Sequence, residues 1–277
     1  MRKFLTPQLI DELTALVSRA AAAVMDIRSA SLVVRKKPDS SPVTAADEAS
    51  EEIITEGLRR LLPGLDVVSE EATAQSASHA VAPMFALVDP LDGTREFVAG
   101  RDEFAINLAI IAEGRPVFGL IAAPALQLIW RCNADGGAER LRLAAGAAIE
   151  TARDKTPVQT ITPPGPRLRA LTSRSHLDEQ TKAWLAQHSA ETIVCGSSVK
   201  FCRLAEGAAD VYPRLAPTME WDVAAGDAIL TAAGGALHTP EGRPLVYGQA
   251  SRGLVVPAFV AWGVPPGAPP GNGLNRS

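Results

Sequence analysis

Cysteine is scarce in this chain of 277 residues. Its three cysteines, Cys132, Cys195 and Cys202, form no CxxC pair and leave an odd thiol. This pattern argues against a disulfide scaffold and a cysteine-based zinc site, and it is typical of reduced structural residues. We therefore expect a cytoplasmic protein, and peripheral attachment to the inner membrane is left open.

Long apolar runs and an excess of one charge are also missing. No run of about 18 apolar residues lacks a charge or a helix breaker, so no membrane-spanning helix is predicted. Near the N-terminus, Asp11, Glu12 and Thr14 interrupt the apolar residues, so no secretory signal is predicted. The chain has 27 Lys plus Arg against 31 Asp plus Glu, so binding to a nucleic acid polymer is not expected.

The spacing of apolar residues is informative in this chain. It alternates along the sequence between the period of a helix and that of a strand. Composition and pattern alone therefore predict an α/β protein. The predicted helices cover 6–30, 44–62, 176–187, 198–206 and 223–233. The predicted strands cover 67–68, 85–88, 104–111, 116–121, 168–172 and 192–195.

Two carboxylates stand three residues apart directly after the predicted strand 85–88. They are Asp89 and Asp92 of the segment Asp-Pro-Leu-Asp-Gly-Thr, in which Pro90 and Gly93 shape a tight turn. Carboxylate and carbonyl oxygens suit Mg2+ better than zinc, and no Cys/His cluster competes. The segment therefore indicates a magnesium site, although a purely structural turn has the same composition.

Two further acids extend this group. Glu70 ends its own short strand, and its neighbour Glu71 is expected to be solvated. Asp222 precedes the predicted helix 223–233, where a helix N-cap is the alternative to a metal ligand.

Three segments of the sequence, taken together, carry a specific resemblance to a known family. DPLDGTREF (89–97), EWDVAAGDAIL (220–230) and VVSEE (67–71) resemble the signatures of the lithium-sensitive inositol monophosphatase superfamily. The strings SPVTAAD (41–47), LTSRSH (171–176), GSSVKFCRLAEGAADVYPR (196–214) and PTMEWD (217–222) resemble its CysQ-type 3'(2'),5'-bisphosphate nucleotidases. The likeness covers roughly residues 10 to 262. It implies the layered α-β-α-β-α sandwich of the inositol monophosphatase/fructose bisphosphatase (sugar phosphatase) superfamily.

The resemblance implies two to three Mg2+ ions. One is held by Glu70, Asp89 and the carbonyl of Leu91, and a second by Asp89, Asp92 and Asp222. A third, more weakly held ion is expected near Glu70. Two such cations clamp a phosphate and activate the attacking water.

The resemblance also assigns catalytic roles, which fall on Asp47, Thr94 and Glu70. Thr94 would orient the attacking water, and Asp47 would accept a hydrogen bond from the Thr94 hydroxyl. Helix-cap and turn roles for Asp47 and Thr94 are the structural alternative.

Substrate contacts are implied mainly in the second half of the chain. Lys200 and Arg214 suit a phosphate that is bound but not cleaved. The alternatives without a substrate contact are solvated charges for Lys200 and Arg214, a helix-start position for His176 and a helix cap for Ser197. The full set implied by the resemblance is Gly93, Thr94, His176, Ser197, Lys200, Arg214 and Asp222.

The expected reaction is Mg2+-dependent removal of the 3'-phosphate of adenosine 3',5'-bisphosphate, which gives AMP and phosphate. The sulfonucleotide 3'-phosphoadenylyl sulfate is a further expected substrate. Two alternatives remain: an inositol, sugar or histidinol phosphatase with the same metal site, and a non-catalytic metal-binding regulatory protein. Lys200, Arg214 and the SRSH string argue against the first. The assembled site argues against the second.

The predicted organisation has two subdomains and a tail. Residues 1–145 form an α/β unit with most of the metal ligands, and residues 146–262 form an α/β unit with the substrate contacts. Pro163, Pro164 and Pro166 mark the boundary region, and 263–277 is expected to be a flexible tail. The expected partner is a small phosphorylated nucleotide, and a homodimer is left open.

Overall fold

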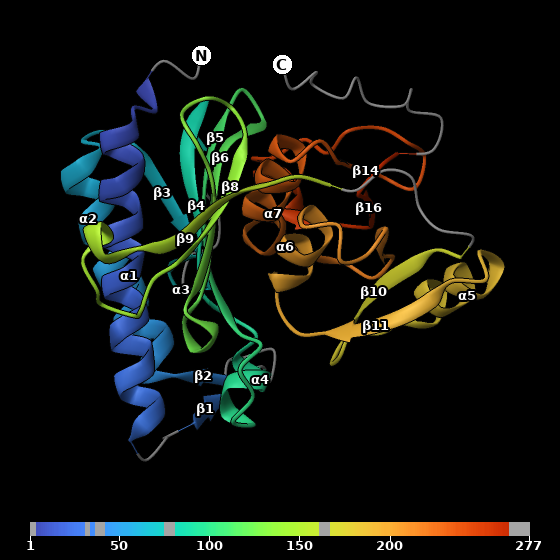
Figure 1. Ribbon diagram of the computed structural model, residues 1–277, viewed down its shortest axis with the longest axis horizontal. Coiled ribbons are helices and arrows are strands. Elements are labelled where there is room, and N and C mark those ends of the chain that lie inside the picture. The colour runs from blue at the N-terminus through green and yellow to red at the C-terminus, as the bar shows by residue number, and fades with distance from the viewer. Residues whose placement is uncertain (1–3, 31–33, 37–41, 75–80, 161–166, 266–277) are drawn as a thin grey trace.

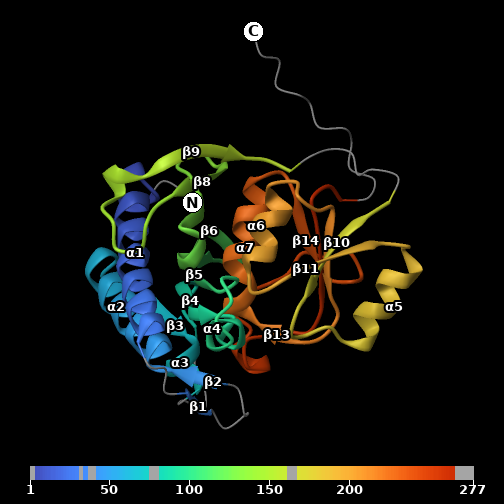
Figure 2. The same ribbon diagram turned by 60° about the horizontal axis from the view of Figure 1, so that its bottom comes forward.

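Five layers of helix and sheet make up the molecule (Figures 1 and 2). The computed structural model describes residues 4–30, 34–36, 42–74, 81–160 and 167–265. Helices α1 and α2 cover a seven-stranded sheet, α6 and α7 lie behind that sheet, a five-stranded sheet follows, and α5 lies outermost (Figure 1). This confirms the predicted α-β-α-β-α sandwich.

The seven-stranded sheet has its strands in chain order, β3 to β9. The pair β3 and β4 is parallel and every later pair is antiparallel. Every residue of β5 is buried, because helices cover both faces of the sheet. The strands are β3 Asp66–Ser69, β4 Met84–Asp92, β5 Ala105–Ala112, β6 Arg115–Ala123, β7 Leu128–Cys132, β8 Ala138–Arg142 and β9 Arg153–Val158.

The outer layer consists of α1 (Pro7–Ser29) and α2 (Ala45–Leu61). The hydroxyl of Thr6 accepts the N–H of Leu9 at the start of α1, as an N-cap does. A Cβ at Gly57 would lie 2.2 Å from Cδ1 of Leu16, so the two helices approach as closely as only glycine allows.

The central layer consists of α6 (Val199–Ala205) and α7 (Glu220–Ala232). Helix α7 is buried along most of its length, because sheets lie on both sides of this layer. Small residues permit this: a Cβ at Gly119 of β6 would lie 2.3 Å from the carbonyl oxygen of Ala225. A Cβ at Gly226 would lie 2.3 Å from the Phe201 ring.

The second sheet has the order β11-β10-β12-β16-β14, and α5 (Glu179–Gln187) covers its outer face (Figure 1). Strands β10 and β11 are parallel. Its strands are β10 Arg169–Ser173, β11 Glu191–Cys195, β12 Val211–Arg214, β14 Ala236–His238 and β16 Phe259–Trp262. The minor elements are β1 Val34–Lys36, β2 Pro42–Thr44, α3 Glu70–Ala74, α4 Thr94–Val98, η2 Pro124–Leu126, η3 Ile149–Thr151, β13 Thr218–Met219, η4 Ala250–Arg252 and β15 Val255–Val256.

Two predicted helix starts were wrong. Helix α5 begins at Glu179 rather than 176, because Asp178 accepts the N–H of Thr181 and caps it. Helix α7 begins at Glu220 rather than 223, so its first turn contains Glu220 and Asp222.

The predicted division of the chain at residue 145 stays a prediction. Strand β9 lies beyond that residue and still pairs with β8 in the first sheet. Pro163, Pro164 and Pro166, and residues 266–277 of the predicted tail, lie outside the described residues. In the described part of the chain, no helix combines the length and apolar character needed to cross a membrane.

Candidate active site

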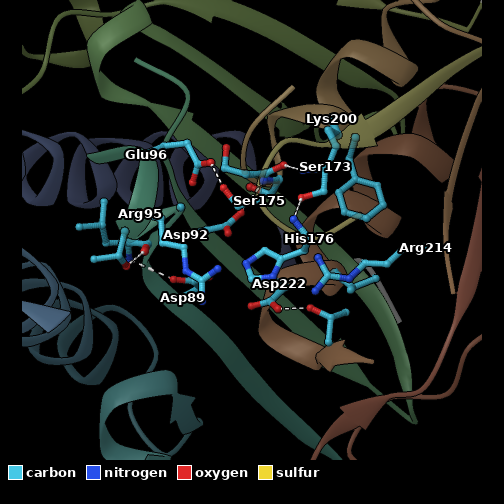
Figure 3. A pocket seen from close by; sticks show the side chains of 18 of the residues that line it. Asp89, Asp92, Arg95, Glu96, Ser173, Ser175, His176, Lys200, Arg214 and Asp222 are labelled. Atoms are coloured by element: carbon cyan, nitrogen blue, oxygen red, sulfur yellow. Dashed lines mark hydrogen bonds between the residues drawn. The ribbon is translucent and has the colours of Figure 1, made fainter. Parts of the chain in front are cut away.

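One cavity of about 170 Å³ brings the two halves of the chain together. Every predicted site residue except Asp47 lines it. We call Glu70, Asp89, Asp92 and Asp222 its acidic side, and Lys200, Arg214 and His176 its basic side. Figure 3 labels all of these residues except Glu70. The remaining lining residues are Leu91, Gly93, Thr94, Arg95, Glu96, Ser173, Ser175, Ser197, Ser198, Phe201, Tyr212, Thr218, Val223 and Phe259.

Asp89 and Asp92 stand at the end of β4, where the regular pairing with β5 breaks between them. The backbone N–H of Leu91 donates to Oδ1 of Asp89 at 3.0 Å. The hydroxyl of Ser50 donates to the carbonyl of Pro90 at 2.8 Å, which fixes the turn to α2. The turn therefore directs both carboxylates into the cavity.

Glu70 is the first residue of α3, immediately after β3. Glu51 of α2 holds this junction, since its Oε1 accepts the hydroxyl of Ser69 and the N–H of Ala72, the latter at 3.1 Å. The expectation that Glu71 is solvated was wrong: it is buried at 8% exposure. Its position in the first turn of a short helix turns it inward.

Asp222 is the third residue of α7 and not its N-cap, so the cap alternative was wrong in position. Its Oδ2 instead accepts the N–H of Met219 at 3.1 Å and the hydroxyl of Thr218. This carboxylate thus closes the start of α7 from inside the helix while it lines the cavity.

The electrostatics of the acidic side favour a bound cation. Burial raises the pKa of Asp89 well above its ordinary value, and the charges of Glu70, Asp92 and Asp222 raise it further. Burial and the charge of Asp222 raise the pKa of Asp92 to about 6. A divalent cation would relieve this repulsion, and the donors are the oxygens that Mg2+ prefers.

Within the described ranges, no three Asp, Glu, His or Cys side chains stand in the arrangement of a formed metal-binding group. The fit to a metal therefore depends on the type of donor and on the mutual repulsion of the carboxylates. On both counts the acidic side suits Mg2+.

Thr94 and Asp47 lie beside this group. Asp47 is buried, and its Oδ2 accepts the N–H and the hydroxyl of Thr44 at 2.7 and 2.8 Å. The hydroxyl of Thr94 lies 3.2 Å from Oδ1 of Asp47 and 3.0 Å from the carbonyl oxygen of Leu91. Because a hydroxyl has one proton, it donates to one of these acceptors and can accept a hydrogen bond from water.

The cations of the basic side are not solvated charges. Lys200 is 3% exposed, its ammonium donates to the carbonyl of Ser197, and its Nζ lies 5.2 Å from the centroid of the Tyr212 ring. Arg214 is half-buried; its Nη2 donates to the carbonyl of Pro217 at 3.3 Å. Its Nε is buried without a hydrogen-bond acceptor among the described residues.

His176 is exposed at the rim of the cavity. Loss of water around its ring lowers its pKa, and the positive charges of Arg214 and Arg95 lower it further. His176 is therefore held mainly neutral at neutral pH, beside cations that already supply the positive charge (Figure 3).

Ser197 and Gly93 lie where the halves touch. Ser197 has φ of 46°, in the left-handed region, and a Cβ at Gly93 would lie 3.2 Å from Cβ of Ser197. Gly93 itself has φ of 87°. Glycine is therefore needed at 93 for its conformation and for the close approach.

Sequence reasoning assigned no role to several cavity residues. Arg95 follows a predicted site residue directly, which was the available signal. Glu96, also next to that motif, is buried, and its Oε1 accepts the hydroxyl of Ser175 at 2.6 Å (Figure 3). Nothing in the sequence indicated that Ser175 would lie there, because its partner is 79 residues away.

The chain matches known proteins over nearly its whole length. The model of the inositol monophosphatase family matches residues 7–263. Over 242 residues the chain is 37% identical to the 3'(2'),5'-bisphosphate nucleotidase CysQ of Escherichia coli (strain K12), which covers 86% of this chain and 94% of that protein. The CysQ of Buchnera aphidicola is 34% identical over 253 residues, covering 88% and 89% of the two proteins.

Solved structures give the same result. CysQ from Bacteroides thetaiotaomicron, a bacterial member of the inositol monophosphatase family, superposes with a TM-score of 0.73 at 31% identity, covering 91% of this chain and 95% of that one. An inositol monophosphatase from Thermotoga maritima superposes with a TM-score of 0.71 at 20% identity, covering 90% and 89% of the two chains. The second match supports the fold alone.

Proposed function

The chain belongs to the inositol monophosphatase family, and from this premise we propose that it is a 3'(2'),5'-bisphosphate nucleotidase. It removes the 3'-phosphate of adenosine 3',5'-bisphosphate to give AMP and phosphate. The corresponding reaction of 3'-phosphoadenylyl sulfate, which gives adenylyl sulfate, is part of the same proposal. The identity with CysQ proteins supports this class of substrate.

The observation that carries the proposal is the two-sided cavity. Its acidic side suits metal ions that bind the phosphate to be cleaved. Its basic side carries the buried Lys200 and the half-buried Arg214. A substrate with one phosphate uses only the first of these. A nucleotide with two phosphates uses both, and burial makes each charge-assisted hydrogen bond to the second phosphate stronger than it would be in water.

We propose that Glu70, Asp89, Asp92, Asp222 and the carbonyl of Leu91 hold two to three Mg2+ ions. When bound, Mg2+ supplies Lewis acidity: it neutralises charge on the phosphate and makes water a better nucleophile at neutral pH. Burial of Asp89 and Asp92 keeps their charges from being fully screened by solvent.

The chain's own groups do the rest of the work. The hydroxyl of Thr94, donating to Asp47, accepts a hydrogen bond from the attacking water and directs its lone pair to phosphorus. As the water attacks, it gives a proton to the Thr94 hydroxyl, and the hydroxyl proton of Thr94 moves to Asp47, which Thr44 holds in place. Lys200, Arg214 and Ser197 hold the ribose-phosphate end, and His176 lies near the base.

The test is a comparison of substrates. Phosphate release with Mg2+ is measured from adenosine 3',5'-bisphosphate, inositol 1-phosphate and fructose 1,6-bisphosphate at matched concentrations. We expect kcat/KM for the nucleotide to be higher by a factor of about 10² or more than for inositol 1-phosphate, which has no second phosphate to pair with Lys200 and Arg214. It should also exceed the value for fructose 1,6-bisphosphate, whose second phosphate is not carried on a nucleoside. A higher value for an inositol or sugar phosphate would overturn the substrate proposal while leaving the acidic side intact. If none of the three substrates releases phosphate, the proposal that the protein is a phosphatase is overturned.

A further inference from the structure

His176 and Lys200 of the basic side stand on or next to two loops at one end of the second sheet, and Arg214 is the last residue of β12. Strands β10 and β11 are parallel neighbours, so the segments 174–178 and 196–198 that follow them leave the sheet at the same edge. The first segment carries His176. The second carries Ser197 and leads directly into α6 with Lys200. The positions of these loops therefore determine the positions of His176, Ser197 and Lys200.

Both loops are tied to the other half of the chain. The hydroxyl of Ser175 in the first loop donates to Glu96 at 2.6 Å (Figure 3). In the second loop, the N–H of Ser198 donates to Asp92, and its hydroxyl donates to Oδ1 of Asn107 at 2.6 Å.

Glu103 joins both loops with one carboxylate oxygen. Its Oε2 accepts Nη2 of Arg174 at 2.7 Å and Nε at 3.2 Å, and it also accepts the N–H of Gly196 at 3.0 Å. A Cβ at Gly196 would lie 2.7 Å from the carbonyl oxygen of Glu103, so the backbones are in close contact as well. Glu103 is not among the residues that line the cavity.

We infer that Glu103 is a positioning residue, which sets the two substrate loops at their working distance from the acidic side without touching the substrate. This inference rests on the proposed function. Since Arg174 and Gly196 flank His176 and Ser197, loss of the Glu103 contacts releases both loops together. The metal ligands stand on other elements, and the contacts of Ser198 with Asp92 and Asn107 do not involve Glu103, so the ligands keep their positions. The effect therefore falls on binding of the nucleotide's second phosphate and base, and not on cleavage itself.

The test compares two substrates in two variants. Glu103→Gln keeps an oxygen for the Gly196 N–H but loses the charge that holds Arg174. We expect the KM for adenosine 3',5'-bisphosphate to rise about tenfold with kcat nearly unchanged. Hydrolysis of p-nitrophenyl phosphate, which has one phosphate and no nucleoside, should keep its kcat/KM. Arg174→Gln should show the same split, and the double variant should be no worse than either single one.

A matched control lies one residue away. Asp102 also forms an ion pair, with Arg28 of α1 at 2.9 Å, but it contacts neither loop. Asp102→Asn should leave both substrates unaffected. Calorimetric titration with AMP gives a second readout, in which Glu103→Gln should weaken binding about tenfold and Asp102→Asn should not.

The outcomes separate this inference from the proposed function. If Glu103→Gln and Arg174→Gln slow both substrates equally, or if Asp102→Asn has the same effect, Glu103 has a general structural role and the inference is overturned. If wild-type protein prefers inositol 1-phosphate, the proposed function fails. The variants are then compared on inositol 1-phosphate and p-nitrophenyl phosphate, where a selective rise in KM still supports the positioning role and an equal loss overturns it.

Discussion

The acidic and basic sides of the cavity are held in place by different kinds of contact. On the acidic side, Asp89 and Asp222 accept backbone N–H groups two and three residues away in the chain. On the basic side, the loops depend on Glu96 and Glu103, which are 79 and 93 residues from their partners. Apart from Asp92, which accepts the N–H of Ser198 from the other half, the acidic side is thus a product of local turns, whereas the loops of the basic side are held by contact between the halves.

This difference also appears in the energetics. The acidic side stores repulsion, since burial and like charges raise the pKa of Asp89 and Asp92. The cations on the basic side lie near compensating groups: Lys200 near the Tyr212 ring, and Arg214 near Asp222, whose charge raises the pKa of Arg214 against the effect of burial. We therefore expect changes on the acidic side to abolish turnover without unfolding the protein, and changes on the basic side to alter affinity.

The largest effect is expected at the acidic side. Asp92→Asn removes a proposed metal ligand, so kcat should fall by a factor of about 10³ or more. The melting temperature should hold or rise, because the repulsion from Asp222 is gone. The measurement is phosphate release together with calorimetric unfolding. The control is Asp154→Asn, because Asp154 is an exposed acid paired with Arg142. Near-wild-type turnover in Asp92→Asn would contradict the assignment of Asp92 as a metal ligand.

A smaller loss is expected for the group that directs the water. Thr94→Ala should lower kcat about 10²-fold with little change in KM, because the hydroxyl that bridges Asp47 and the water is lost. Thr94→Ser keeps the hydroxyl and should recover most of the rate. Equal losses in the two variants would mean that the threonine methyl group, and not the hydroxyl, is what matters.

On the basic side, Lys200→Gln should change affinity rather than rate. We expect KM for adenosine 3',5'-bisphosphate to rise about 10- to 100-fold, because a charge-assisted hydrogen bond to phosphate is lost. Activity on p-nitrophenyl phosphate should change much less. Lys182→Gln is the control, since that exposed lysine pairs with Glu179 on α5 and is not among the residues that line the cavity. A fall in kcat for both substrates would contradict the division between the two sides.

The smallest effect concerns a buried acid that belongs to neither side. Burial raises the pKa of Asp227 on α7 to about 6, although Tyr247 and Thr231 donate hydrogen bonds to it at 2.9 and 3.2 Å. The folded state therefore binds this proton more tightly than the unfolded state. Stability should fall as pH rises toward 6 and then level off above it.

The measurement is urea unfolding of wild type and Asp227→Asn. Between about pH 4.5 and about pH 7, wild type should lose roughly 1 to 2 kcal/mol more than the variant. The difference between the two proteins removes the contributions of other titrating groups, including Asp89 and Asp92. Parallel pH profiles would show that Asp227 has an ordinary pKa in the folded state.

The same division explains what could be predicted from the sequence. Asp89, Asp92 and Thr94 lie within six residues after an apolar strand, so a local pattern contains the whole turn. Helices α1 and α2 were predicted within a residue of their ends, because their apolar stripes and caps are local as well. The cavity brings these residues together with Glu70 and Asp222, and their roles as ligands stay predictions.

What the sequence did not reveal depends on distant partners. Strands β12 and β16 are short, and they exist because they pair with each other across 45 or more residues. Glu51 and Glu103 gave no signal, since a glutamate that accepts a hydrogen bond from a distant loop has the same local pattern as a solvated one. Glu96 was marked only by its place in the string DPLDGTREF. The burial of Glu71 was missed as well.

Helix α7 is clamped between two sheets, and this has a consequence for mutational tolerance. In a saturation scan of the chain, a larger residue at Gly226 has to displace the Phe201 ring, and one at Gly119 has to displace the α7 backbone. A larger residue at Gly119 pushes α7 away from the first sheet and toward the second, and one at Gly226 pushes α7 away from α6. We expect Gly119 and Gly226 to accept almost no replacement on their own, and any accepted enlargement to appear together with a second, size-reducing change across the helix.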